Sequence, residues 1–232
     1  MTDGNQFVGS VRRRIRKHVI ERRASTERAH IVSRLDAADY LSLGALFWAW
    51  VAILLMASRE PNWGIVAMLA AFGFDKLDGY VARQYGLTSS LGLQIDSYID
   101  AFTYLVTGGL LYHFAVSPTP VLSAVVGFAL LTFGGLRLIR HTNEGFGDDD
   151  GTSYYRGITV VHANVVVVAS YFVTQFGSAF DGWLAAPVIV AISPVMVSDY
   201  KSYKTAYSHV ILGVLAVVAM GLALAIEYGL VS

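Results

Sequence analysis

The chain has 232 residues, of which 55% are apolar, and its mean hydropathy is +0.53. It has no cysteine, which excludes disulfides, thiolate metal sites and cysteine nucleophiles. The formal net charge is zero, so charge gives no reason to expect nucleic acid as a partner. The apolar fraction and the mean hydropathy exceed those of an ordinary soluble domain and predict one integral membrane domain.

Residues 1–34 are predicted to form a basic juxtamembrane segment. Val8, Val11, Ile15 and Val19 follow steps of three and four, which place them on one face of a helix. Cations fill the rest of that helix, so it is expected to lie flat on an anionic membrane surface. The alternative is a solvated basic helix that only sets the topology of the spans.

Seven apolar segments follow, and they predict an all-α, polytopic membrane helix bundle over residues 35–232. Lysine and arginine set the orientation, because these residues favour cytoplasmic loops. With the N-terminus in the cytoplasm, sixteen of the seventeen cations lie inside and only Arg59 lies outside. The C-terminus is then outside, or inside if the sixth segment does not cross. The predicted segments are 39–57, 62–82, 93–115, 119–139, 158–177, 181–198 and 206–228.

Four aspartates stand out where the second and third segments meet. Asp75 and Asp78 share one helical face, and Asp96 and Asp100 share another, because their spacings are three and four residues. The linker between them contains Gly86 and can turn the chain back, so two antiparallel helices would aim four carboxylates at one point. Four such charges in a poorly solvated place would either take up protons or need cations.

Magnesium or manganese suits oxygen ligands of this kind, and two such ions can clamp a pyrophosphate. Gly79 and Gly92 would let a nucleotide or a helix approach closely, and Arg83 could hold a phosphate. The competing interpretation makes the aspartates helix caps and salt-bridge partners at a membrane edge. The paired spacings and the two glycines favour the metal site.

The pattern Asp75-x2-Asp78-Gly79-x2-Ala82-Arg83-x8-Gly92-x3-Asp96-x3-Asp100 resembles the signature of the CDP-alcohol phosphotransferase family without a substitution. The resemblance implies a six-helix core, a homodimer, and displacement of CMP from a CDP-linked lipid by an alcohol. It also implies residue roles. Asp75, Asp78, Asp96 and Asp100 would ligate metal, with Asp100 also serving as base, and Gly79, Ala82 and Arg83 would contact the CDP group.

Weaker likenesses concern the acceptor and resemble the phosphatidylserine synthase branch. They are Gly135–Arg140, Tyr155–Ile158 and Val195–Tyr203, although Thr159 and Val161 stand where that branch has prolines. Arg137 and Arg140 could bind a substrate carboxylate or phosphate, or serve only as topology-setting cations. L-serine is therefore the expected acceptor, at an active site on the cytoplasmic face.

Other functions are also compatible with parts of the pattern. Inositol phosphate or glycerol phosphate could replace serine with the same chemistry. A cation transporter could use the aspartates as an ion path, although the fourth and fifth segments contain no acidic residue and the sixth contains only Asp181, at its first position. A catalytically silent membrane scaffold is the third alternative, and the intact signature argues against it.

Overall fold

The structure is a computed structural model that describes residues 30–86, 89–149, 151–177, 179–203 and 205–231. It divides into two compact units, Met1–Asp36 and Ala37–Ser232. The described part of the first unit contains one 3₁₀ turn, Ile31–Arg34. The predicted amphipathic helix lies outside the described residues.

The second unit is an all-α bundle, as predicted, and each of the seven predicted segments falls in a helical run. The largest difference is at the fourth segment, whose helix continues to Glu144. The runs are α2 (Ala37–Ala57), α3 (Pro61–Tyr85), α4 (Ser90–Asp100) continued by η2 (Ala101–Val106), α5 (Thr107–Leu111) and η3 (Tyr112–Val116), α6 (Pro120–Glu144), α7 (Val160–Phe176), α8 (Gly182–Ile192) with η4 (Ser193–Val197), and α9 (Ala206–Glu227).

Local sequence explains where these helices begin and end. Prolines occupy the first turns of α3 and α6, where a missing N–H does no harm. Side chains of Ser89 and Thr119 accept hydrogen bonds from the first turns of α4 and α6. Gly86 ends α3 in the left-handed conformation, with φ of 66°, which a glycine adopts without strain.

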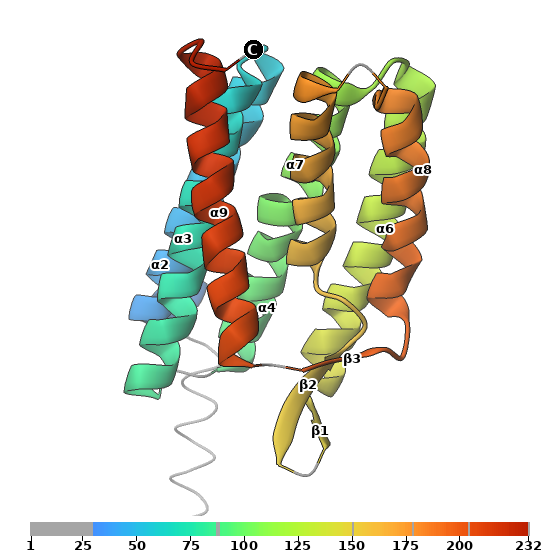
Figure 1. The fold of residues 1–232 in the computed structure, drawn as a ribbon. Helices are drawn as coiled ribbons and strands as arrows, with labels where there is room; N and C mark the ends of the chain where they lie inside the picture. Colours follow the sequence, from blue (N-terminus) through green and yellow to red (C-terminus); the bar gives the residue numbers. More distant parts are fainter. Residues whose placement is uncertain (1–29, 87–88, 150, 178, 204, 232) are drawn as a thin grey trace, which may run out of the picture. The chain divides into compact units, whose positions relative to one another are not determined.

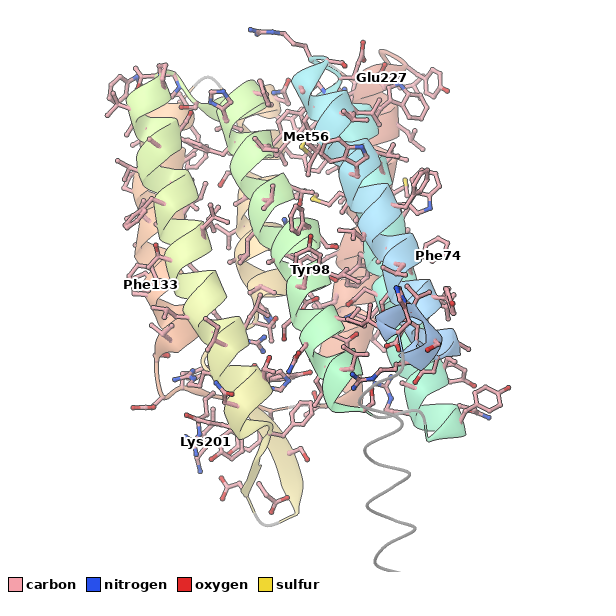
Figure 2. All side chains as sticks on the ribbon, turned by 180° about the vertical axis from the view of Figure 1, so that it is seen from behind. Met56, Phe74, Tyr98, Phe133, Lys201 and Glu227 are labelled. Carbon is pink, nitrogen blue, oxygen red and sulfur yellow. The ribbon has the colours of Figure 1, made fainter. Side chains whose placement is uncertain are left out.

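Successive runs alternate in direction, so α3 and α6 end where α4, α7 and α9 begin (Figure 1). We call this the sheet end, because a small sheet lies there. Lys201 lies at this end, whereas Met56 and Glu227 lie at the opposite one (Figure 2). The C-terminal end of α3 and the start of α4 therefore both lie at the sheet end, and these two helices carry the aspartates.

The sheet was not predicted. It has the order β1-β2-β3, with β1 (Gly147–Asp149) and β2 (Thr152–Arg156) antiparallel and β3 (Lys201–Tyr203) antiparallel to β2. The strands are too short to show an alternating pattern, and β3 comes from a distant part of the chain. Asp149 of β1 accepts hydrogen bonds from Lys201 Nζ (2.6 Å) and Tyr203 Oη (2.9 Å) of β3.

Small residues allow the helices to pack closely around the third run. A Cβ at Gly134 of α6 would lie 2.4 Å from a methyl carbon of Leu105, so only glycine lets η2 approach α6 there. Gly157, with φ of 75°, lies against the backbone of Met196 in the same way. These close contacts hold η2 against α6, and η4 against the chain at Gly157.

Four helices among the described residues are long and apolar enough to span a membrane, which agrees with an integral membrane protein. They are α2, Leu91–Val116, α6 and Val210–Glu227. The helices over Val160–Phe176 and Gly182–Val197 are apolar but shorter. α3 is long enough, but every 18-residue stretch of it contains Asp75, Lys76 and Asp78.

Candidate active site

The four aspartates meet at the sheet end of the bundle, as their spacing predicts. Asp75 and Asp78 come from the last turns of α3, and Asp96 and Asp100 come from α4. Asp78 lies within electrostatic reach of Asp75 and Asp96, and Asp100 within reach of Asp75 and Asp96. The structure thus brings together carboxylates from two helices that the linker around Gly86 turns antiparallel.

Ser42 of α2 connects the two helices, and the sequence analysis did not identify it. Its hydroxyl donates to Asp78 Oδ2 at 2.5 Å and lies 3.4 Å from Asp96 Oδ1. Asp78 itself is buried. The only sequence signal was the spacing of Asp39 and Ser42, two polar residues three positions apart on one face of an otherwise apolar helix.

Asp75 is held by two other side chains. Lys76 Nζ lies 2.7 Å from Asp75 Oδ2, and Tyr104 Oη donates to the same oxygen at 2.8 Å. Tyr104 belongs to η2, a π-helical stretch that begins directly after Asp100. Wider π turns of this kind are frequent at functional sites. Asn164 of α7 donates to the Tyr104 carbonyl at 2.8 Å and so fixes this turn.

The other signature residues line the same region. A Cβ at Gly79 would lie 3.2 Å from Arg83, so the exposed Arg83 side chain folds back over that glycine. A Cβ at Gly92 would lie 3.2 Å from both Asp39 and Ser89. Ala82 lies between Gly79 and the end of α3 and is partly exposed. The two glycines therefore leave room that larger residues would fill.

Arg137 of α6 lies beside the aspartates. It is buried at 4% exposure and within electrostatic reach of Asp100. Its guanidinium carbon lies 5.2 Å from the ring centre of Tyr155, a cation–π contact with β2. Phe146 and His141 pack on the same tyrosine ring at 4.9 Å and 5.4 Å. Tyr155 of β2, packed against Phe146 and His141, thus supports a buried cation within electrostatic reach of Asp100.

Arg140 has a different environment from Arg137. Its two terminal nitrogens donate to backbone carbonyls of Arg156 (2.7 Å), Val197 (3.0 Å) and Ser198 (3.1 Å), with Met196 at 3.4 Å. The side chain therefore joins α6 to the end of η4 and to β2. Binding a substrate would require it to give up these hydrogen bonds.

The donor set of four carboxylates suits a hard divalent cation such as magnesium or manganese. No three His, Cys, Asp or Glu side chains in the described part of the chain are grouped closely enough to hold one ion as they stand. Instead Lys76 places a positive charge directly on Asp75, and Ser42 and Tyr104 fill two of the oxygens. The residues present fit a divalent ion by type, since all four are carboxylates.

An apolar cavity of about 260 Å³ shares one lining residue, Tyr104, with the surroundings of Asp75. Its walls are formed by α3, α7 and α9, and the Tyr104 ring contributes to it while the Tyr104 hydroxyl bonds Asp75. One side chain therefore links the apolar cavity to the acidic cluster. A cavity of this kind suits a hydrocarbon chain.

Comparison with known proteins identifies the family. The family model for CDP-alcohol phosphatidyltransferases matches residues 35–226. The chain belongs to this family. Enzymes of the CDP-alcohol phosphatidyltransferase family generally depend on divalent metal ions, which agrees with the chemistry of the four carboxylates.

Individual relatives carry more specific names. The chain is 28% identical over 173 residues to an archaetidylserine synthase of Methanothermobacter thermautotrophicus, covering 74% of this chain and 71% of the relative. It is 28% identical over 189 residues to a CDP-diacylglycerol–serine O-phosphatidyltransferase of Helicobacter pylori, covering 79% and 76%. A Methanocaldococcus jannaschii protein of the same name is 34% identical over 107 residues, covering 46% and 48%.

Proposed function

We propose that this protein transfers the phosphatidyl group, or its ether-lipid equivalent, from a CDP-linked lipid to the hydroxyl of L-serine and releases CMP. The observation that carries the proposal is the meeting of four aspartates from α3 and α4, with the buried Arg137 within electrostatic reach of Asp100 and with Tyr104 joining Asp75 to an apolar cavity. A lipid-linked pyrophosphate and a small acidic acceptor would need these three features side by side. The names of the relatives support serine as the acceptor.

Asp75, Asp78, Asp96 and Asp100 would hold magnesium or manganese. When bound, the metal would stabilise the charge on the leaving CMP and lower the pKa of a coordinated hydroxyl. The serine oxygen attacks the lipid-side phosphorus, and the bond from that phosphorus to the bridging oxygen of CMP breaks. Asp100, which lies within electrostatic reach of Arg137, accepts the hydroxyl proton.

Gly79, Ala82, Arg83 and Gly92 would receive the nucleotide. The missing side chains at the two glycines would let the nucleotide approach the backbone of α3 and α4 once Arg83 turns away from Gly79. Arg83 is exposed at the end of α3, so its guanidinium can turn from Gly79 to a phosphate. The lipid chain would occupy the cavity beyond Tyr104, which places the reacting phosphorus at the aspartates.

Arg137 would bind the acceptor carboxylate. It is buried, it faces Asp100, and its cation–π contact with Tyr155 holds the guanidinium in place. Arg140 was also predicted to bind substrate. We assign it to the carbonyls of β2 and η4, because its nitrogens donate to them.

We further propose that the sheet end faces the cytoplasm and that the protein forms a homodimer. Among the described residues of the bundle, Arg59 follows α2 at the end opposite to the sheet, whereas the other lysines and arginines lie toward the sheet end. That asymmetry favours a cytoplasmic sheet end, where CMP and serine are available. The dimer is an expectation from the family resemblance.

The test is CMP release from a labelled CDP-lipid by the purified protein in membranes, with L-serine, inositol phosphate and glycerol phosphate as separate acceptors. We expect serine-dependent release that requires magnesium or manganese. Asp96→Asn and Asp100→Asn should each lower it by more than about 100-fold, since each removes several kcal/mol of transition-state stabilisation.

Asp148→Asn is the matched control, because Asp148 is an acidic residue of the hairpin that accepts only a local hydrogen bond from Gly151. It should retain activity. Serine-dependent release that survives Asp100→Asn would refute the assigned roles. CMP release that requires inositol phosphate or glycerol phosphate instead of serine would support the proposed reaction but show that the acceptor is not serine. Cation flux into vesicles without CMP release would favour the transporter.

A further inference from the structure

Ser42 occupies a position that the signature does not cover. It lies in the second turn of α2, and only 1% of its surface is exposed. Its oxygen lies within hydrogen-bond range of acceptors on three different helices. These are the Ala38 carbonyl of α2 at 3.2 Å, Asp78 Oδ2 of α3 at 2.5 Å and Asp96 Oδ1 of α4 at 3.4 Å.

A buried serine in a helix usually donates to the carbonyl four residues earlier and does nothing else. Ser170 of α7 is an example, with its hydroxyl 2.8 Å from the Val166 carbonyl. Ser42 differs, because its distance to Asp78 is shorter than its distance to Ala38. A hydroxyl has one hydrogen, so the short contact indicates that it is donated to the carboxylate and not to its own helix.

Asp78 and Asp96 repel each other, because both are carboxylates on neighbouring helices within electrostatic reach. The Ser42 oxygen lies between them and occupies one oxygen of Asp78. This contact restrains the rotation of that carboxylate. α2 thereby acts on the ligands that α3 and α4 supply.

We propose that Ser42 is a positioning residue for the divalent metal, which orients Asp78 and Asp96 before the ion binds. The proposal rests on the proposed function, since it assumes that these aspartates are metal ligands. Groups that hydrogen-bond to metal ligands fix their orientation, and their loss typically lowers metal affinity by about 10–100-fold. Ser42 is expected to contribute in this range through its hydroxyl alone.

The experiment measures Mn²⁺ binding to the purified protein without substrates, by electron paramagnetic resonance of the free ion. Ser42→Thr and Ser42→Val have the same shape and differ only in the hydroxyl. We expect Ser42→Val to weaken Mn²⁺ binding by about 10–100-fold and Ser42→Thr to stay near the wild type. Ser170→Val, the matched control, removes a buried hydroxyl far from the aspartates in sequence and should bind Mn²⁺ like the wild type.

Equal binding by Ser42→Val and Ser42→Thr, whether strong or weak, would overturn the proposal, because the hydroxyl would then have no role of its own. If added volume at this position prevents folding, Ser42→Ala removes the hydroxyl without adding volume and makes the same comparison with the wild type. A wild-type protein that binds no Mn²⁺ would refute the metal site itself. Wild-type binding that Asp96→Asn abolishes, together with unchanged binding by Ser42→Ala, would refute the role of Ser42 alone.

Discussion

Replacing Arg140 by methionine should destabilise the bundle more than it affects substrate binding. The arginine donates three hydrogen bonds of 2.7–3.1 Å to carbonyls of Arg156, Val197 and Ser198. Methionine keeps the apolar stem and removes all three. The carbonyls at the end of η4 would then lack the donor that joins them to α6.

The magnitude follows from these contacts. A hydrogen bond from a charged donor contributes about 1.5–3 kcal/mol when well buried. Arg140 is only partly buried, and water can reach some of the freed carbonyls, so about 1 kcal/mol for each bond is more reasonable. The expected loss is therefore about 3 kcal/mol. For a chain of this length that corresponds to a fall in the melting temperature of roughly 6–12 °C.

The assay is thermal unfolding in detergent, followed by the fluorescence of the four tryptophans. Arg83→Met is the control, because Arg83 is exposed at the end of α3 and should leave the melting temperature unchanged. The Michaelis constant for serine is measured on both variants. An unchanged melting temperature in Arg140→Met, combined with a raised constant for serine, would contradict this reasoning and assign Arg140 to the substrate.

Three further outcomes are expected. Tyr155→Leu removes the cation–π support of Arg137, worth about 1 kcal/mol, and should raise the Michaelis constant for serine about fivefold in initial-rate assays, whereas Tyr155→Phe should not. Ala219→Phe should fill the cavity and lower the turnover of a long-chain CDP-lipid at least about tenfold, but leave the turnover of a short-chain analogue unchanged. Val217→Phe, on the exposed face of α9, should leave the turnover of both lipids unchanged. Hydrogen bonds from a lysine and a tyrosine of β3 hold the pKa of Asp149 below its usual value. The amide protection of the β1–β2 hairpin, measured by hydrogen exchange, should therefore be complete above the ordinary aspartate pKa and should be lost as the pH falls through the lower pKa of the folded state. Protection that persists below that pH would show that the ionised carboxylate is not needed.

The acidic site could be predicted in outline because helical spacing is a local property. Asp75 with Asp78, and Asp96 with Asp100, share faces for reasons that depend only on the pitch of a helix. Gly86 made the reversal between α3 and α4 readable as well, since a left-handed residue ends a helix. The seven helical runs could be predicted too, because an uninterrupted apolar segment is also a local property of the sequence.

The partners of those aspartates could not be predicted. Ser42 reaches Asp78 across 36 positions, and Tyr104 of η2 reaches Asp75 across 29. A serine in an apolar helix and a tyrosine in a span are ordinary residues until packing decides what they face. The sheet could not be predicted either, because its strands are only three to five residues long. In addition, β3 pairs with β2, which lies more than 40 positions earlier in the chain.

The two arginines show the difference most clearly. Sequence alone determined that this is a membrane enzyme of the CDP-alcohol phosphatidyltransferase family, because hydropathy and the aspartate signature are carried by residues close together in the chain. It gave Arg137 and Arg140 the same prediction, since they lie one helical turn apart. Only the tertiary structure separated them: Arg137 faces Asp100 and the ring of Tyr155, whereas Arg140 faces backbone carbonyls, because the surroundings of a side chain come from other helices and strands.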